Sequence, residues 1–68
     1  MPSDTSSASA ELQVVADAVE RQRDRVAAVA EPFLGTERDD IVTAIHEAER
    51  QLRIAARALH RAVRTLEG

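Results

Sequence analysis

Apolar residues between positions 41 and 66 recur in steps of four and three residues, alternating without a break. That spacing places them on one face of an α-helix, whereas the apolar residues of a half-buried strand would alternate. The series is Ile41, Ile45, Ala48, Leu52, Ala55, Leu59, Ala62 and Leu66. One heptad position carries the larger side chains and the other carries alanines, which let a second helix approach closely. The sequence therefore predicts one long helix that packs tightly against another.

A similar stripe lies earlier in the chain. Its members are Leu12, Val15, Val19, Val26, Val29 and Phe33, and Gln22 takes the one polar place among them. Ser9 is of a type that caps helix N-termini, and Pro32 disfavours helical geometry in the residue before it. We expect the first helix over about residues 9–31. Residues 1–8 are rich in Ser and Thr and poor in apolar side chains, which predicts a disordered tail.

The segment between the two stripes carries turn and helix-start signals. Gly35 can adopt the left-handed conformation that closes a turn. Thr36 is a candidate N-cap, and the acidic residues that follow suit the positive end of a helix dipole. We expect a turn over residues 32–36 and a second helix over about residues 37–66. The fold class predicted from these signals is all-α, an antiparallel helical hairpin.

The apolar stripes are wider than one helix–helix contact needs. Val42, Ala56 and Val63 flank the stripe of the second helix. A chain of 68 residues without cysteine has no disulfide to stabilise a small core. We therefore expect two hairpins to form a homodimeric four-helix bundle, and the alternative is a monomeric hairpin that is only partly folded.

Five arginines lie on the outer side of the second helix. They are Arg50, Arg53, Arg57, Arg61 and Arg64, with Ile54 among them. Acidic residues of the first helix, from Asp17 to Glu31, gather away from its stripe in the same way. The arginine ridge is a solvated face, a surface for a protein partner that includes a second copy, or a contact for nucleic acid. The pI near 5.2 and the near absence of aromatic residues disfavour nucleic acid.

No arrangement of residues typical of catalysis is found. HEAER at residues 46–50 lacks the second histidine of a zinc helix, and His46 and His60 are too far apart along one helix to share an ion. We expect no enzyme activity, no cofactor and no metal site. Gln22 and Arg23 interrupt the first stripe, either as a buried polar register key or ligand clamp, or with Arg23 extending from the edge of the seam to solvent.

Two families share features with this plan. In architecture alone, the hairpin resembles Rop-type dimeric RNA-binding hairpins. The Phe33-Leu34-Gly35 turn is similar to the Trp-x-Gly turn of helical hairpins secreted by type VII systems, which implies secretion as an alternative. The chain has neither an apolar run of about 20 residues nor a Sec-type signal, so we expect a cytoplasmic protein without a membrane partner.

The function expected from the sequence is a non-enzymatic assembly or protein-interaction module. The apolar seam and the charged outer ridges would carry it. A small nucleic-acid-binding regulator that uses the arginine ridge is the alternative, and a type VII-like secreted hairpin is the second.

Overall fold

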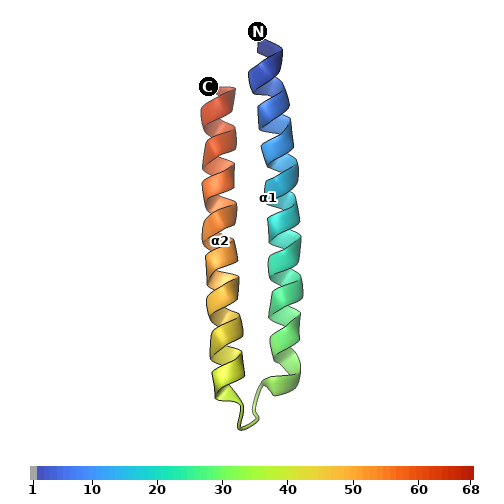
Figure 1. Cartoon of the computed structure of the whole chain (residues 1–68), viewed down its shortest axis with the longest axis vertical. Coiled ribbons are helices and arrows are strands. Elements are labelled where there is room, and N and C mark those ends of the chain that lie inside the picture. The colour runs from blue at the N-terminus through green and yellow to red at the C-terminus, as the bar shows by residue number, and fades with distance from the viewer. Residues whose placement is uncertain (1) are drawn as a thin grey trace.

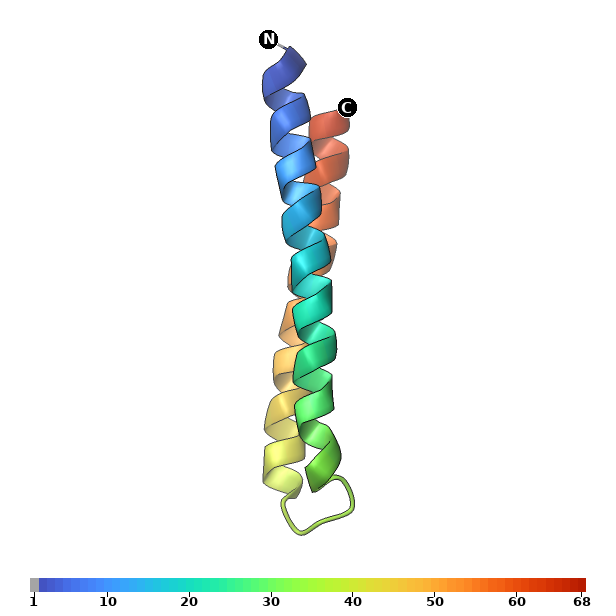
Figure 2. The same ribbon diagram turned by 90° about the vertical axis from the view of Figure 1, so that its right-hand side faces the viewer.

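The protein is an antiparallel pair of long helices joined by a short turn (Figure 1). This computed structural model describes the backbone of residues 2–68 and the side chains from residue 4 onward. The elements are α1 (Pro2–Ala30), the 3-10 turn η1 (Glu31–Phe33) and α2 (Asp39–Glu67). The hairpin measures 57 × 14 × 10 Å, and Figure 2 shows the helices crossing at a shallow angle. The all-α hairpin predicted from the two stripes is confirmed.

The turn uses the residues that the sequence singled out, but one of them has a different role. Gly35 has a φ of 73°, which is the left-handed conformation expected of it. Thr36 does not cap α2, because the N-cap position belongs to Arg38. Its hydroxyl instead donates to the Phe33 carbonyl at 2.6 Å and accepts from the Arg38 backbone N–H at 3.2 Å. Thr36 therefore stabilises the turn itself, and α2 begins at Asp39, two residues later than expected.

The first helix begins much earlier than its expected start near Ser9. Residues 2–8 continue α1, whereas the sequence predicted a disordered tail there; Met1 lies outside the described residues. Proline is tolerated in the first helical turn, and Ser and Thr cost only part of a kcal/mol each in a helix. Ser9 is a buried interior residue that donates a hydrogen bond to Glu67 at 3.1 Å. The contact with the end of α2 stabilises helix where local preference alone favoured a tail.

Small side chains form the buried seam between the helices. The buried residues of α1 are Ser9, Ala16 and Ala30, and those of α2 are Ala56 and Val63. Arg23 completes the row of α1, and its side chain is 31% exposed. This row lies one residue beyond the predicted one, since Val15 and Val29 are exposed. Alanine has so little volume that the two helix backbones can approach closely there, which favours Ala16 over Val15 at the contact.

The large apolar residues of both stripes lie beside this seam and are only half-buried. They are Leu12, Val19 and Val26 of α1, Phe33 of η1, and Ile45, Leu52, Leu59 and Leu66 of α2. No large side chain of the described residues is fully buried. Each of these residues contacts solvent as well as the neighbouring helix, so the hairpin alone does not close its core.

Candidate interaction surface

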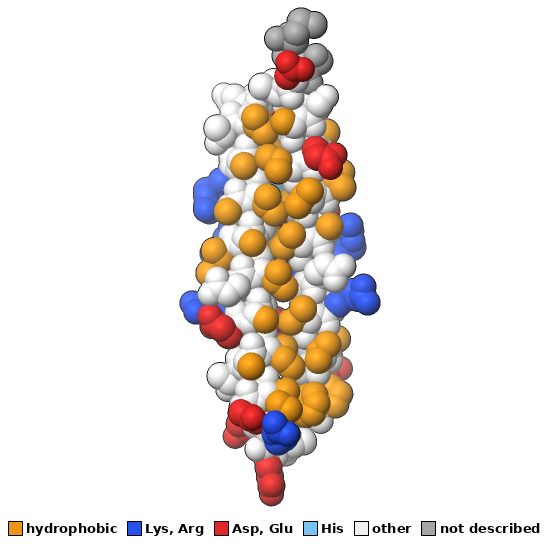
Figure 3. Space-filling view, in the orientation of Figure 1, with side chains coloured by type: hydrophobic (Ala, Val, Ile, Leu, Met, Phe, Trp, Pro, Cys, Tyr) orange, Lys and Arg blue, Asp and Glu red, His pale blue; other side chains and the backbone are white. Residues whose placement is uncertain are grey.

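One broad face of the hairpin is apolar along its length, and we call it the open face. It comprises the half-buried row of large residues and the outer row beside it. The outer row is Val15, Gln22 and Val29 of α1 with Ile41, Ala48, Ala55 and Ala62 of α2. Val15 is 38% exposed and Val29 is 57% exposed. Figure 3 shows apolar side chains in a continuous band along the junction of the helices, with arginines at both margins.

The open face contains the residues that the sequence assigned to the core or dimer seam. Ala48 and Ala55 are exposed, while Ile41 and Ala62 are half-buried. At 100° per residue, the predicted stripe points between the neighbouring helix and the open face. A helix of a four-helix bundle directs its apolar stripe in this way, because it contacts two neighbours rather than one. In the hairpin, the stripe of α2 contacts α1 on one side, and its other side faces solvent.

The opposite side of the hairpin is held by polar contacts. His60 Nε2 lies 2.6 Å from Glu20 Oε1, across the two helices. Asp17 and Asp24 lie on the same side of α1 as Glu20, by helical periodicity. Arg23 packs its stem at the edge of the seam, and its guanidinium lies 3.6 Å from the Asp24 carboxylate. One face of the hairpin is thus polar and internally bonded, while the other is apolar and uncovered.

The arginine ridge of α2 is exposed, as its spacing predicted. Arg50 is paired with an acid of its own helix, because its guanidinium donates a hydrogen bond to the Glu47 carboxylate at 2.8 Å. The hydrogen bond to Arg50 holds the pKa of Glu47 below its usual range, and the pKa of Arg50 is raised in turn. Among the described residues, Arg53, Arg57, Arg61 and Arg64 make no ion pair. Ile54 is 45% exposed beside them.

Glu49 and Arg53 are four residues apart on α2, a spacing that allows an ion pair, but they form none. Glu49 is half-buried toward α1, and its carboxylate lies 3.9 Å from His46 Nε2. Glu49 belongs to the heptad row of Val42, Ala56 and Val63, which lines the seam between the helices. Its direction is set by that packing, which outweighs the few tenths of a kcal/mol of a surface pair.

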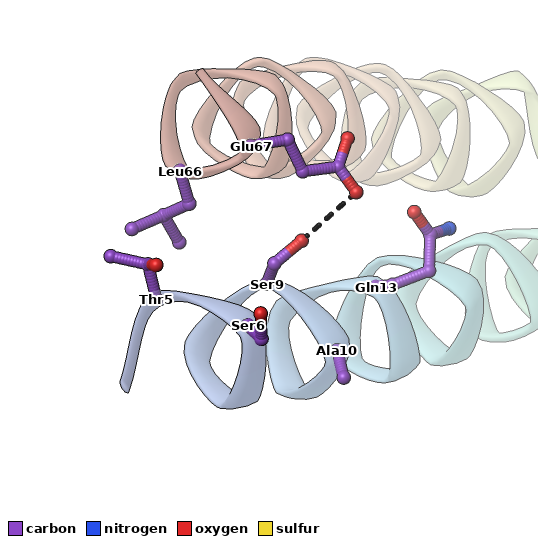
Figure 4. Close-up of a pocket in the computed structure, with 7 residues that line it drawn as sticks. All are labelled: Thr5, Ser6, Ser9, Ala10, Gln13, Leu66 and Glu67. Atoms are coloured by element: carbon purple, nitrogen blue, oxygen red, sulfur yellow. Dashed lines mark hydrogen bonds between the residues drawn. The ribbon is translucent and has the colours of Figure 1, made fainter. Parts of the chain in front are cut away.

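A depression of about 550 Å³ lies between the beginning of α1 and the end of α2 (Figure 4). Thr5, Ser6, Ser9, Ala10, Gln13, Leu66 and Glu67 line it. The Glu67 carboxylate already accepts the hydrogen bond from Ser9. No group of three or more metal-ligating side chains occurs in the described part of the chain. This end of the hairpin is a helix junction open to solvent, and we assign no chemistry to it.

The seam residues that sequence reasoning missed are Ser9, Ala16 and Ala30. They share a heptad row with Arg23, and three of its four members are small. That regular row of small residues was the available signal. It was hidden because the valines one position away are more hydrophobic.

Comparison with known proteins identifies no family for this chain. No protein-family model matches it. Neither the curated proteins nor the solved structures compared with it give a match. No helix in the described residues is long and apolar enough to cross a bilayer. The geometry of the surfaces is therefore the basis for any assignment of function.

Proposed function

We propose that the protein is a non-enzymatic assembly module whose open face binds a second copy of the chain to form a four-helix bundle. The observation that carries this proposal is the row of large apolar side chains along both helices, which the hairpin leaves only half-buried. Removing apolar surface from water stabilises a complex by about 25 cal/mol per Å². The half-buried Leu, Ile, Val and Phe side chains of this row still have such surface to bury. A second open face presents the same apolar row, so a two-fold arrangement covers both at once.

The exposed area of the chain agrees with an interface of ordinary size. The hairpin exposes 4929 Å². A compact monomer of its 7.4 kDa mass would expose about 4200 Å² by the usual scaling with mass. The excess, about 700 Å², is close to the roughly 800 Å² that each partner buries in a standard protein interface. One further molecule on the open face is enough to bring the chain to the surface area of a typical folded protein.

Sedimentation of matched variants tests the proposal. We expect the natural chain to sediment as a dimer at micromolar concentration, and Ala55→Glu to sediment as a monomer. Ala55 is exposed in the hairpin, so a glutamate there should leave the hairpin folded, and the variant should keep its helicity. Ala28→Glu is the control, since Ala28 is exposed on the side of α1 away from the seam. A natural chain that is a cooperatively folded monomer would refute the proposal.

The arginine ridge supports a second candidate function, contact with an acidic partner. Four of its five arginines have no ion pair among the described residues, and arginine is enriched at protein interfaces. Phosphates would be bound by the same groups, so nucleic acid is one class of partner to test. Arg57→Glu combined with Arg61→Glu should then abolish retention of DNA or RNA at low salt while helicity is unchanged. If the natural chain retains no nucleic acid at low salt, that partner is excluded.

A further inference from the structure

The large residues of the open face lie in four evenly spaced levels. The contacts of Ser9 with Glu67 and of Glu20 with His60 set the register between the helices. In that register, to within about one residue, the level pairs are Leu12 with Leu66, Val19 with Leu59, Val26 with Leu52, and Phe33 with Ile45. Seven residues separate successive levels, which is roughly 10.5 Å along a helix. The series is symmetric about the middle of α1, between Val19 and Val26.

Gln22 lies at that centre of symmetry. It is exposed on the open face, and no hydrogen bond satisfies its amide among the described residues. Val15 and Val29 lie seven residues before and after it in the same row. Its neighbour at the same level on α2 is Ala55, which has no polar side chain to offer. The middle of an apolar surface thus carries a single side-chain amide.

Two hairpins can join their open faces about a two-fold axis in two ways. When the axis runs parallel to the helices, both turns lie at the same end and each α1 covers the partner's α2. When the axis is perpendicular to the helices, each turn lies over the open end of the other copy, and α1 covers α1. The four levels match in both arrangements, because their spacing is even and symmetric. The apolar residues alone therefore do not choose between them.

The amide of Gln22 distinguishes the two arrangements. With the parallel axis, Gln22 is buried against the alanine level of the partner's α2 and loses its hydrogen bonds to water. A buried amide without a partner is costly. With the perpendicular axis, the two Gln22 side chains meet at the axis itself. Each amide has a donor and an acceptor, so the pair can bond reciprocally.

We propose that the second copy docks antiparallel, with Gln22 of both chains paired at the two-fold axis. This inference rests on the proposed homodimer. Val15 then lies against Val29 of the other copy, and the level of Val19 lies against that of Val26. Charge supports self-association as well, since four of the five acids of α2 lie in its first half, from Asp39 to Glu49, and the unpaired arginines lie toward its end. A single buried polar residue that fixes orientation has well-known counterparts in coiled coils.

Cysteine crosslinking tests the orientation directly, because the chain contains no cysteine of its own. We expect Gln22→Cys chains to form a disulfide dimer on mild oxidation, which requires Cα atoms within about 7 Å. Val15→Cys chains should not crosslink to one another, but should crosslink when they are mixed with Val29→Cys chains. Val14→Cys, on the outer side of α1, is the control that should stay reduced.

The possible failures are distinguishable. A mixed disulfide between Gln22→Cys and Ala55→Cys chains, without the self-crosslinked Gln22→Cys dimer, would establish the parallel axis and overturn the inference. A dimer in sedimentation that gives neither crosslink would overturn it too, while the proposed function would stand. A monomer in sedimentation would refute the proposed function itself.

A charge at the same position gives an independent measurement. Gln22→Glu brings two carboxylates together at the axis, and like charges that close resist ionisation. We expect its dimer dissociation constant at pH 7 to exceed the value measured at pH 4 by roughly tenfold or more. The natural chain supplies the ordinary pH dependence for comparison. Equal pH dependence of the two chains would contradict the pairing of Gln22 at the axis.

Discussion

Shortening Val29 to alanine separates the stability of the hairpin from that of the dimer. The Val29 side chain is 57% exposed, so α1 and α2 cover less than half of it. Val29→Ala removes two methyl groups, worth about 0.8 kcal/mol each when fully buried. In a monomeric hairpin the covered part contributes about 0.7 kcal/mol by this measure. The exposed remainder contributes only if another molecule covers the open face.

The expected effect on association follows from that remainder. Full coverage in a dimer buries a further share worth about 0.9 kcal/mol per chain, and both chains contribute. The total of about 1.8 kcal/mol raises the dissociation constant roughly 20-fold. Sedimentation equilibrium over a range of concentrations measures this constant. Circular dichroism at each concentration checks that the variant remains helical.

Val14 supplies the matched control. It is 61% exposed, nearly the same as Val29, but lies on the outer side of α1, away from both the seam and the open face. Val14→Ala should therefore cost the hairpin about the same as Val29→Ala and leave the dissociation constant unchanged. Equal dissociation constants for the two variants would refute the assignment of the open face as the interface.

Three further changes test the turn, a surface pair and the polar face. Gly35→Ala forces a residue with a Cβ into a φ of 73°, which should lower the free energy of unfolding by about 1–2 kcal/mol, as measured by urea unfolding. Arg50→Gln removes the main cause of the lowered pKa of Glu47, so that pKa should rise toward its usual value in an NMR titration. Because the pKa of Glu47 is lowered in the folded state, its pair with Arg50 stabilises the fold at pH values above the usual pKa of a Glu side chain. This stabilisation is lost as the pH falls through the pKa of folded Glu47. A double-mutant cycle of Glu20→Ala with His60→Ala should give a coupling of about 0.5–1.5 kcal/mol in unfolding, from the hydrogen bond at 2.6 Å.

The sequence determined the hairpin well because its strongest signals are local. The spacing of Leu52, Leu59 and Leu66 leaves no alternative to a helix, and Gly35 is placed where a left-handed residue closes the turn. The start of α1 was less predictable. Seven residues, six of them with weak helix preference, extend it because Ser9 contacts the end of α2, and that contact exists only once the chain has folded back.

The assignment of rows to the seam could not be read from hydrophobicity. Val15 is more apolar than Ala16, yet Ala16 is fully buried and Val15 is exposed. The contact between two antiparallel helices is decided by how closely their backbones approach, which rewards small volume. Hydrophobicity instead identified the side of each helix that the proposed dimer would shield from solvent. For the same reason, Ala56 is buried in the seam although its spacing predicts only a position at the flank of the stripe.

In the proposed dimer, the two rows would have different roles, one in folding of the hairpin and the other in association. A small-residue row, from Ser9 to Ala30 on α1, holds the hairpin together at close range. The row of large residues borders that seam and forms part of the open face, so in the proposed dimer it would contribute to both contacts. Polar groups that would oppose association, such as the Glu20–His60 pair, lie on the opposite side. Gln22 is the one exception on the open face, and an amide at the centre of symmetry costs little only where its own copy faces it. The proposed antiparallel pairing of two hairpins would account at once for the exposed valines, the alanine row of α2 and the position of that amide.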